Sequence, residues 1–353
     1  ELRGRGEELC SARKGVAVPI ADADSFFGKL VEQVDTLAQS QRQNPLSVDM
    51  TVSRAKKYLA KPEHRIQLSD LVSEEVERIT DRLEQDDMGT QGTFSPEEFQ
   101  RRVAVYESAT EAIAKVCGLI GRWGDGAQLD LVTDAIRTIV DHAEGNMGGL
   151  VVWVEMRRYP AVLLFQACAL GLVRSQSWGK LHQLMGVELD TGYDGTMRII
   201  DAVSPSLWKG DKQDLWNHLP EFDRRYTPLS DHLTDAVFAN WGRAFLSSTG
   251  KLSQDVLLLE TLIAVRYLES SGISELREAM SHESGDNFIW VPVRRAGWDR
   301  EFRRAILPKF ENGEFVETLA RAGFGRGDPD YLALAIENHS RVARRLHWGF
   351  GWM

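Results

Sequence analysis

The 353-residue chain shows no complete catalytic or metal-binding signature. It has no G-x-S-x-G nucleophile elbow, no phosphate loop ending in Gly-Lys-Ser or Gly-Lys-Thr, and no Cys-x-x-Cys pair. Its eight histidines do not form a set with metal-ligand spacing. We therefore expect no metal and no cofactor, and a chain that senses, scaffolds or regulates rather than catalyses.

Cysteine is also scarce, and long apolar runs are missing. Cys117 and Cys168 lie in apolar helical stretches, which predicts buried thiols, and the three cysteines are odd in number and far apart. This usage is typical of a reducing, cytoplasmic setting. The most apolar stretch, residues 161–173, is about thirteen residues long and too short to span a bilayer. We expect a cytoplasmic protein without a membrane partner.

Tryptophan is absent from the first 120 residues, and all ten tryptophans lie at or after Trp123. Residues 1–15 begin with Glu1 and are rich in Gly and Arg, which predicts a linker from a missing upstream segment. The change in composition predicts an N-terminal helical region over 16–145 and a Trp-rich helical region over 146–353. The net charge of −10 disfavours a general nucleic-acid binder, although a local basic patch stays open.

Helical periodicity dominates what is present. Apolar residues recur at helical spacing over 26–37, 72–83 and 99–120, and Ser95-Pro96-Glu97-Glu98 reads as a capping box with proline at the first helical position. Helices at 160–174 and from 177 onward predict a helical hairpin. Strand candidates are few: 16–20, 288–293 with Pro292 near its end, and 150–154, which could be strand or helix. The expected fold is mainly α, an irregular multi-helix array of α-hairpins with a minor short-strand element.

The strongest candidate site is the Arg–Trp segment, residues 290–304. Its fifteen residues include Trp290, Arg294, Arg295, Trp298, Arg300, Arg303 and Arg304. Arg157-Arg158 is a second, smaller cluster of arginines. Trp and Arg are enriched at protein interfaces and also stack on bases. The candidate partner-binding or ligand-binding residues are Trp290, Arg294, Arg295, Trp298, Arg157 and Arg158. We expect Arg294 and Arg295 to be at least partly exposed around an accessible aromatic ring. The alternative is a Trp-packed strand end with solvated arginines.

Two other functions stay open. Residues 151–157 have the order of an apolar strand followed by Glu155, as in metal-dependent nucleases, but Arg157 stands where a lysine is expected and no upstream Asp partner is identifiable. A nuclease or nucleic-acid-processing enzyme is therefore one alternative. A small-ligand pocket lined by Trp and Arg is the other.

Three stretches, 157–164 with Trp178, 225–233 and 290–298, give the chain a family resemblance. It resembles the helical C-terminal part of large bacterial multidomain proteins of the phage-defence type, in which a sirtuin-like, NTPase or Schlafen-like effector module comes first. The resemblance covers about half of the chain, and no effector motif is present. It implies a sensing or scaffolding role, with a protein partner or self-association, and it assigns no site residues.

Overall fold

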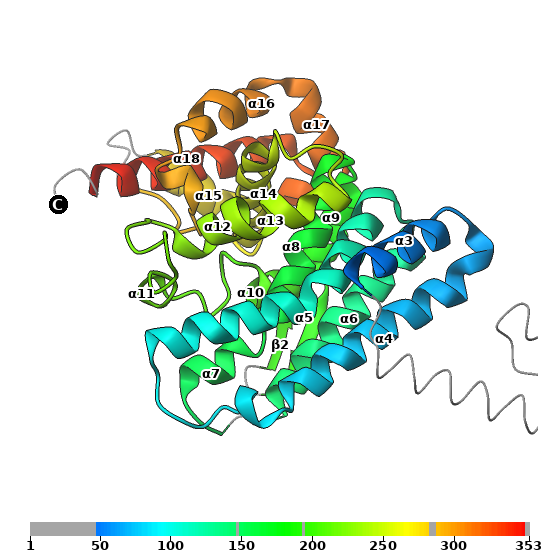
Figure 1. Cartoon of the computed structure of the whole chain (residues 1–353). Helices are drawn as coiled ribbons and strands as arrows, with labels where there is room; N and C mark the ends of the chain where they lie inside the picture. The colour runs from blue at the N-terminus through cyan, green and yellow to red at the C-terminus, as the bar shows by residue number, and fades with distance from the viewer. Residues whose placement is uncertain (1–46, 146–147, 193–194, 282–286, 350–353) are drawn as a thin grey trace, which may run out of the picture. The chain divides into compact units, whose positions relative to one another are not determined.

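Helices follow the apolar periodicity of the sequence, and the described part of the chain is mainly α with one short antiparallel sheet. The computed structural model describes residues 47–145, 148–192, 195–281 and 287–349, and from Val48 onward these belong to one compact unit (Figure 1). Its first helices are α3 (Val48–Leu59), α4 (Arg65–Leu83), α5 (Pro96–Trp123), α6 (Gly126–Glu144), α7 (Val151–Met156), α8 (Tyr159–Arg174), α9 (Trp178–Gly186) and α10 (Ile199–Val203).

The start of α5 confirms the predicted cap in part. The Ser95 hydroxyl accepts a hydrogen bond from the backbone N–H of Glu98 at 3.1 Å, and Pro96 is the first helical residue. The Glu98 carboxylate does not complete a capping box. It accepts instead from Arg101 at 2.8 Å and from Arg102 at 2.6 Å, because two guanidinium groups one turn ahead attract it more strongly than one backbone N–H.

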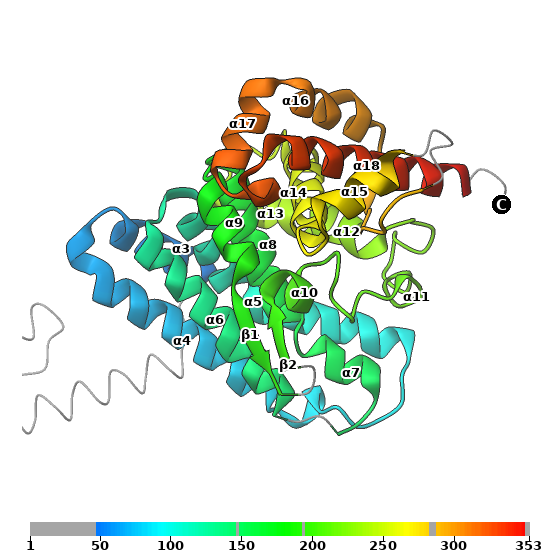
Figure 2. The same cartoon turned by 180° about the vertical axis from the view of Figure 1, so that it is seen from behind.

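Helix α8 lies at the centre of the fold. Every residue from Tyr159 to Val173 is buried, as expected for a helix that is apolar on all sides. It packs against α5 and α6 on one side and against α14 (Leu252–Leu268) on the other (Figures 1 and 2). Helices from both sides of residue 145 thus contribute to one apolar core. The division into 16–145 and 146–353 stays a prediction.

Helices α5 and α8 approach closely because small residues face each other. A Cβ atom added to Gly171 of α8 would lie 2.5 Å from the Gly118 carbonyl oxygen and 2.8 Å from the Arg122 nitrogen of α5. Cys117 and Cys168 are buried free thiols on the same two helices, which confirms the prediction for both.

The remaining helices follow α10 along the chain, and the last of them packs against α14. They are α11 (Gln213–Trp216), α12 (Pro228–His232), α13 (Phe238–Trp241), α15 (Ile273–Ser281), α16 (Leu307–Glu311), α17 (Gly313–Arg321) and α18 (Pro329–Gly349). Two π-turns, Leu233–Val237 and Phe302–Ile306, lie directly before α13 and α16. Pro308 accounts for the second, because proline has no N–H to donate and its ring would clash with the Arg304 carbonyl in a regular α-helix.

The sheet consists of β1 (Glu188–Thr191) and β2 (Gly195–Arg198), paired antiparallel from Glu188 opposite Arg198 to Thr191 opposite Gly195. The strand expected at 288–293 is wrong: this segment belongs to no helix and no strand. The Asn338 side chain takes the place of a neighbouring strand, since its amide accepts from the Ile289 N–H and donates to the Ile289 carbonyl, both at 2.8 Å.

Some expectations fall outside the described residues, namely the linker 1–15, the strand 16–20, the helix 26–37 and Cys10. Within the described ranges, no helix combines the length and the apolar character that crossing a membrane requires.

Candidate functional site

The structure separates the six predicted site residues into two places. Arg157 and Arg158 lie at the junction of α7 and α8, and both are buried. Arg157 is 1% exposed and donates to the Leu83 carbonyl at 3.0 Å and to the Glu84 carboxylate at 2.8 Å. Arg158 pairs with Glu144 at 2.6 Å. These guanidinium groups join the start of α8 to the ends of α4 and α6, so they offer no open binding surface.

Arg295 lies inside a buried polar cluster. Its side chain is 7% exposed, and its guanidinium group lies 3.2 Å from Asp231, 3.5 Å from Asp235 and 3.4 Å from Asp299. The expectation that Arg295 is partly exposed is therefore wrong. Three carboxylates surround this cation, and removal of an arginine from water is tolerable only with such partners.

A fourth carboxylate, Glu260 of α14, contacts the cluster through the backbone of Arg295. It accepts from the Arg295 backbone N–H at 3.2 Å and from the Ser230 hydroxyl. Burial raises the pKa of Glu260 to about 7, against the opposing effects of the Ser230 hydrogen bond and the Arg295 charge. Burial also raises the pKa of Asp231 to about 6, opposed by Arg295.

Arg294 was expected to be at least partly exposed, but its side chain is only 15% exposed and its guanidinium group is engaged inside the protein. Its guanidinium group pairs with the buried Asp211 and donates to the Pro205 carbonyl. Burial raises the pKa of Asp211, with Arg294 opposing. This ion pair ties the Arg–Trp segment to the loop that precedes α11.

Between these two segments lies a pocket of about 310 Å³, which we call the aromatic pocket. Its main walls are Tyr226, Pro228, Trp290, Pro292, Arg294 and Trp298. The Trp298 indole N–H donates to the Thr227 hydroxyl at 3.0 Å, and the Arg295 guanidinium lies 5.4 Å from the Trp298 ring centroid. The ring is thus held in place by a hydrogen bond and a cation–π contact.

The rim of the aromatic pocket exposes large rings. Trp290 is 57% exposed and Tyr226 is 48% exposed, whereas tryptophans such as Trp153, Trp208 and Trp216 are buried. Trp290 packs edge-on against Tyr267, with the centroids 5.7 Å apart. Sequence reasoning found Trp290, Arg294 and Trp298. It missed Tyr226 and Asp211, because they lie more than 60 residues earlier in the chain and only the fold brings them near.

A second pocket, of about 360 Å³, shares Trp298 with the first. We call it the arginine pocket, and it is lined by Gly297, Trp298, Asp299, Arg300, Arg303 and Arg304. The three arginines are exposed. Sequence analysis placed them in the Arg–Trp segment but not among the candidate site residues.

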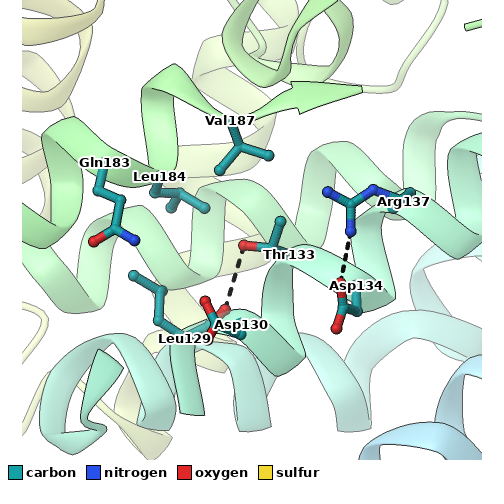
Figure 3. A pocket seen from close by; sticks show the side chains of 8 residues that line it. All are labelled: Leu129, Asp130, Thr133, Asp134, Arg137, Gln183, Leu184 and Val187. Carbon is teal, nitrogen blue, oxygen red and sulfur yellow. Dashed lines mark hydrogen bonds and ion pairs between the residues drawn. The ribbon is translucent and has the colours of Figure 1, made fainter. Parts of the chain in front are cut away.

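A third pocket, of about 430 Å³, lies between α6 and α9 and is shown in Figure 3. Its arginine is occupied, since Arg137 pairs with Asp134 at 2.6 Å, and the Thr133 hydroxyl donates to the Leu129 carbonyl at 3.4 Å (Figure 3). Within the described residues, none of its polar lining atoms is buried without a hydrogen-bond partner. The lining of this pocket therefore gives no indication that it binds a ligand.

Glu155 does not have the setting that the nuclease alternative assumed. Residues 151–156 form helix α7 instead of a strand, so no apolar strand leads into this carboxylate. In the described part of the chain, no three His, Cys, Asp or Glu side chains come together in a way that could hold a metal ion.

The comparisons with known proteins add no relative to this picture: no protein-family model, no curated protein and no solved structure matches the chain.

Proposed function

We propose that the chain is a non-enzymatic sensor or regulatory module that recognises a protein partner through the aromatic pocket. The observation that carries the proposal is the pair of exposed rings, Trp290 and Tyr226, on the rim of a pocket walled by Trp298 and two prolines. Trp, Tyr and Arg supply most of the binding energy in protein interfaces when they surround such pockets.

The rigid support behind the pocket favours the same function. Arg294 and Arg295 are held by ion pairs with buried carboxylates on the loop before α11 and on α12. A surface that is already ordered loses little conformational entropy when a partner binds. The arginines expected as contact residues thus act as supports, and the exposed rings are the contacts.

The wider assignment follows the sequence resemblance. As the helical part of a larger, phage-defence-type protein, the module would relay partner binding to an effector. A nuclease built around Glu155 is the weaker alternative, because the strand that motivated it is a helix. A small-ligand site remains compatible with the pockets of the Arg–Trp segment.

Site-specific photo-crosslinking tests the proposal. A photo-reactive phenylalanine analogue is placed at position 290 in one variant and at position 123 in another, and each is expressed in the organism that encodes the chain. Trp123 is a matched control, since it is 55% exposed at the end of α5 and lines neither pocket of the Arg–Trp segment. We expect a discrete protein adduct from position 290 alone.

The affinity of the purified partner for variants of the chain is then measured. Trp290→Ala should weaken its affinity at least tenfold, and Trp123→Ala should leave it unchanged. If the adduct is a second copy of the chain, self-association is the mode of recognition. Absence of a position-specific adduct, or equal affinity of the two variants, would refute the proposal.

A further inference from the structure

The arginine pocket has an excess of available positive charge in an acidic chain. Among the described residues, Arg300 and Arg303 make no hydrogen bond or ion pair, and Arg304 has only a loose one, 3.9 Å from Glu301. The side chain of Arg304 is 84% exposed. The chain has a net charge of −10, so three arginines around one pocket give this part of the surface the opposite charge to the protein as a whole.

Two carboxylates, Asp299 and Glu301, lie close to these arginines and already have other partners. Asp299 pairs with Arg295 at 3.4 Å and accepts from the Glu301 backbone N–H at 2.9 Å. Glu301 accepts from the neutral Gln254 amide at 3.2 Å and lies 3.9 Å from Arg304. Neither carboxylate pairs with Arg300 or Arg303, and Asp299 is the one carboxylate among the lining residues against three arginines, so an anion entering the pocket meets a net positive charge.

The pocket also has an aromatic wall. Trp298 lines it, and the ring is held in place through its hydrogen bond to Thr227 and its contact with Arg295. A fixed ring beside several guanidinium groups suits a ligand that has both a flat ring and a phosphate. Arginines bind phosphate in a bidentate manner, and nucleobases stack on tryptophan.

From this juxtaposition we propose that the arginine pocket binds a nucleotide, with its phosphate on Arg300, Arg303 and Arg304 and its base against Trp298. This inference deepens the proposed function, because the nucleotide would lie beside the rings that bind the partner. A regulatory role for the nucleotide rests on that proposed function. The nucleotide is either free or part of a single strand, and the chemistry of the site is the same for both.

Fluorescence polarisation of a labelled AMP, with unlabelled competitors, tests the inference. We expect AMP to compete at least tenfold better than adenosine or inorganic phosphate, since only AMP engages both walls. Stronger competition by a single-stranded oligonucleotide, with a steep dependence on salt, assigns the site to nucleic acid. Equal or stronger competition by AMP assigns it to free nucleotide.

Charge reversal locates the site. The triple variant Arg300→Glu, Arg303→Glu and Arg304→Glu should lose at least tenfold in AMP affinity with an unchanged circular dichroism spectrum. The matched control reverses three scattered exposed arginines, Arg65, Arg224 and Arg277, and should keep its affinity despite the same change in net charge. Should the triple variant not fold, Arg303→Gln alone must still weaken binding relative to Arg277→Gln.

The two proposals fail separately. Trp290→Ala should keep AMP binding, and the triple variant should keep the crosslink at position 290. Equal binding by the triple variant and its control, or phosphate competing as well as AMP, overturns the nucleotide site and leaves the partner proposal in place. If the protein retains AMP binding but gives no crosslink from position 290, the partner proposal fails and the nucleotide site stands.

Discussion

At the scale of single residues, Arg295 is the side chain on which the interior of the candidate site depends. Its guanidinium group pairs with Asp231, Asp235 and Asp299, and its backbone N–H donates a hydrogen bond to Glu260. Arg295→Met keeps most of the side-chain volume but leaves buried carboxylates without a cation. We expect a loss of about 3–5 kcal/mol in the free energy of unfolding, measured by urea titration at neutral pH.

The exposed Arg303→Met is the control for Arg295→Met and should change the free energy of unfolding by less than about 0.5 kcal/mol. Similar urea midpoints for both variants would show that Arg295 is not needed inside. This expectation replaces the sequence-based one, in which Arg294 and Arg295 are partly exposed partner contacts.

Glu260 should make stability depend on pH in a direction opposite to that of most carboxylates. Its folded pKa, about 7, lies above the unfolded value near 4.3. The folded state therefore binds the proton more tightly, so this contribution is full below about pH 4 and is lost as the pH rises through 7. Glu260→Gln should flatten the fall in unfolding free energy between pH 5 and 8.

Urea titrations at several pH values check the effect of Glu260, with the exposed Glu278→Gln as a control that keeps the wild-type slope. Asp231 has a folded pKa of about 6 and should leave a residual fall at lower pH. A Glu260→Gln profile that parallels the wild type would contradict the assignment.

At the scale of elements, the cap of α5 is a local device with a measurable effect. Ser95→Ala removes the hydrogen bond to the Glu98 N–H and should destabilise the chain by about 1 kcal/mol, whereas Ser95→Asp should retain most of the stability. Thermal unfolding followed by circular dichroism distinguishes the two. An unchanged midpoint for Ser95→Ala would mean that the cap does not contribute.

The contact between α5 and α8 is the second test at this scale. Alanine favours helix over glycine, yet Gly171→Ala should destabilise by about 1–3 kcal/mol because its Cβ would press on the α5 backbone. At Gly126, the first residue of α6, an added Cβ meets no atom within 4 Å, so Gly126→Ala should be neutral or slightly stabilising. Equal urea midpoints would indicate a looser contact.

The elements that sequence reasoning predicted are those whose causes are local. Ser95-Pro96 marks the start of α5 because the cap and the first N–H groups are three residues apart. The apolar residues at 288–293 favour a strand, but the group that hydrogen-bonds this segment, the Asn338 side chain, lies 49 residues from Ile289 and is not visible in the local pattern. Burial of Arg295 was not predictable either, since Asp231 of α12 and Asp235 of the π-turn after it reach Arg295 only through the tertiary fold.

At the scale of the whole molecule, the shared core predicts that the described unit unfolds in one cooperative step. Cys117 lies in the predicted region 16–145 and Cys168 in the region 146–353, and both are buried. In a Cys10→Ser background, both thiols should become reactive at one urea concentration, which is also the midpoint of tryptophan fluorescence. Mass spectrometry of the labelled peptides follows each thiol separately, and two distinct midpoints would establish two separately folding regions.

The π-turn at Phe302–Ile306 bears on how this surface is acquired or lost in evolution. A π-turn contains one residue more than the α-helix would need, and Arg303 and Arg304 lie within this one. While Pro308 is present, a regular α-helix through this stretch would press the proline ring against a carbonyl of the preceding turn. Deletion of a single codon in the turn is therefore expected together with replacement of Pro308, and it shortens the stretch that lines the arginine pocket. A one-residue gap in an alignment of future homologues at this position, paired with loss of Pro308, would therefore mark a branch in which the arginine pocket is changed while the helices around it persist.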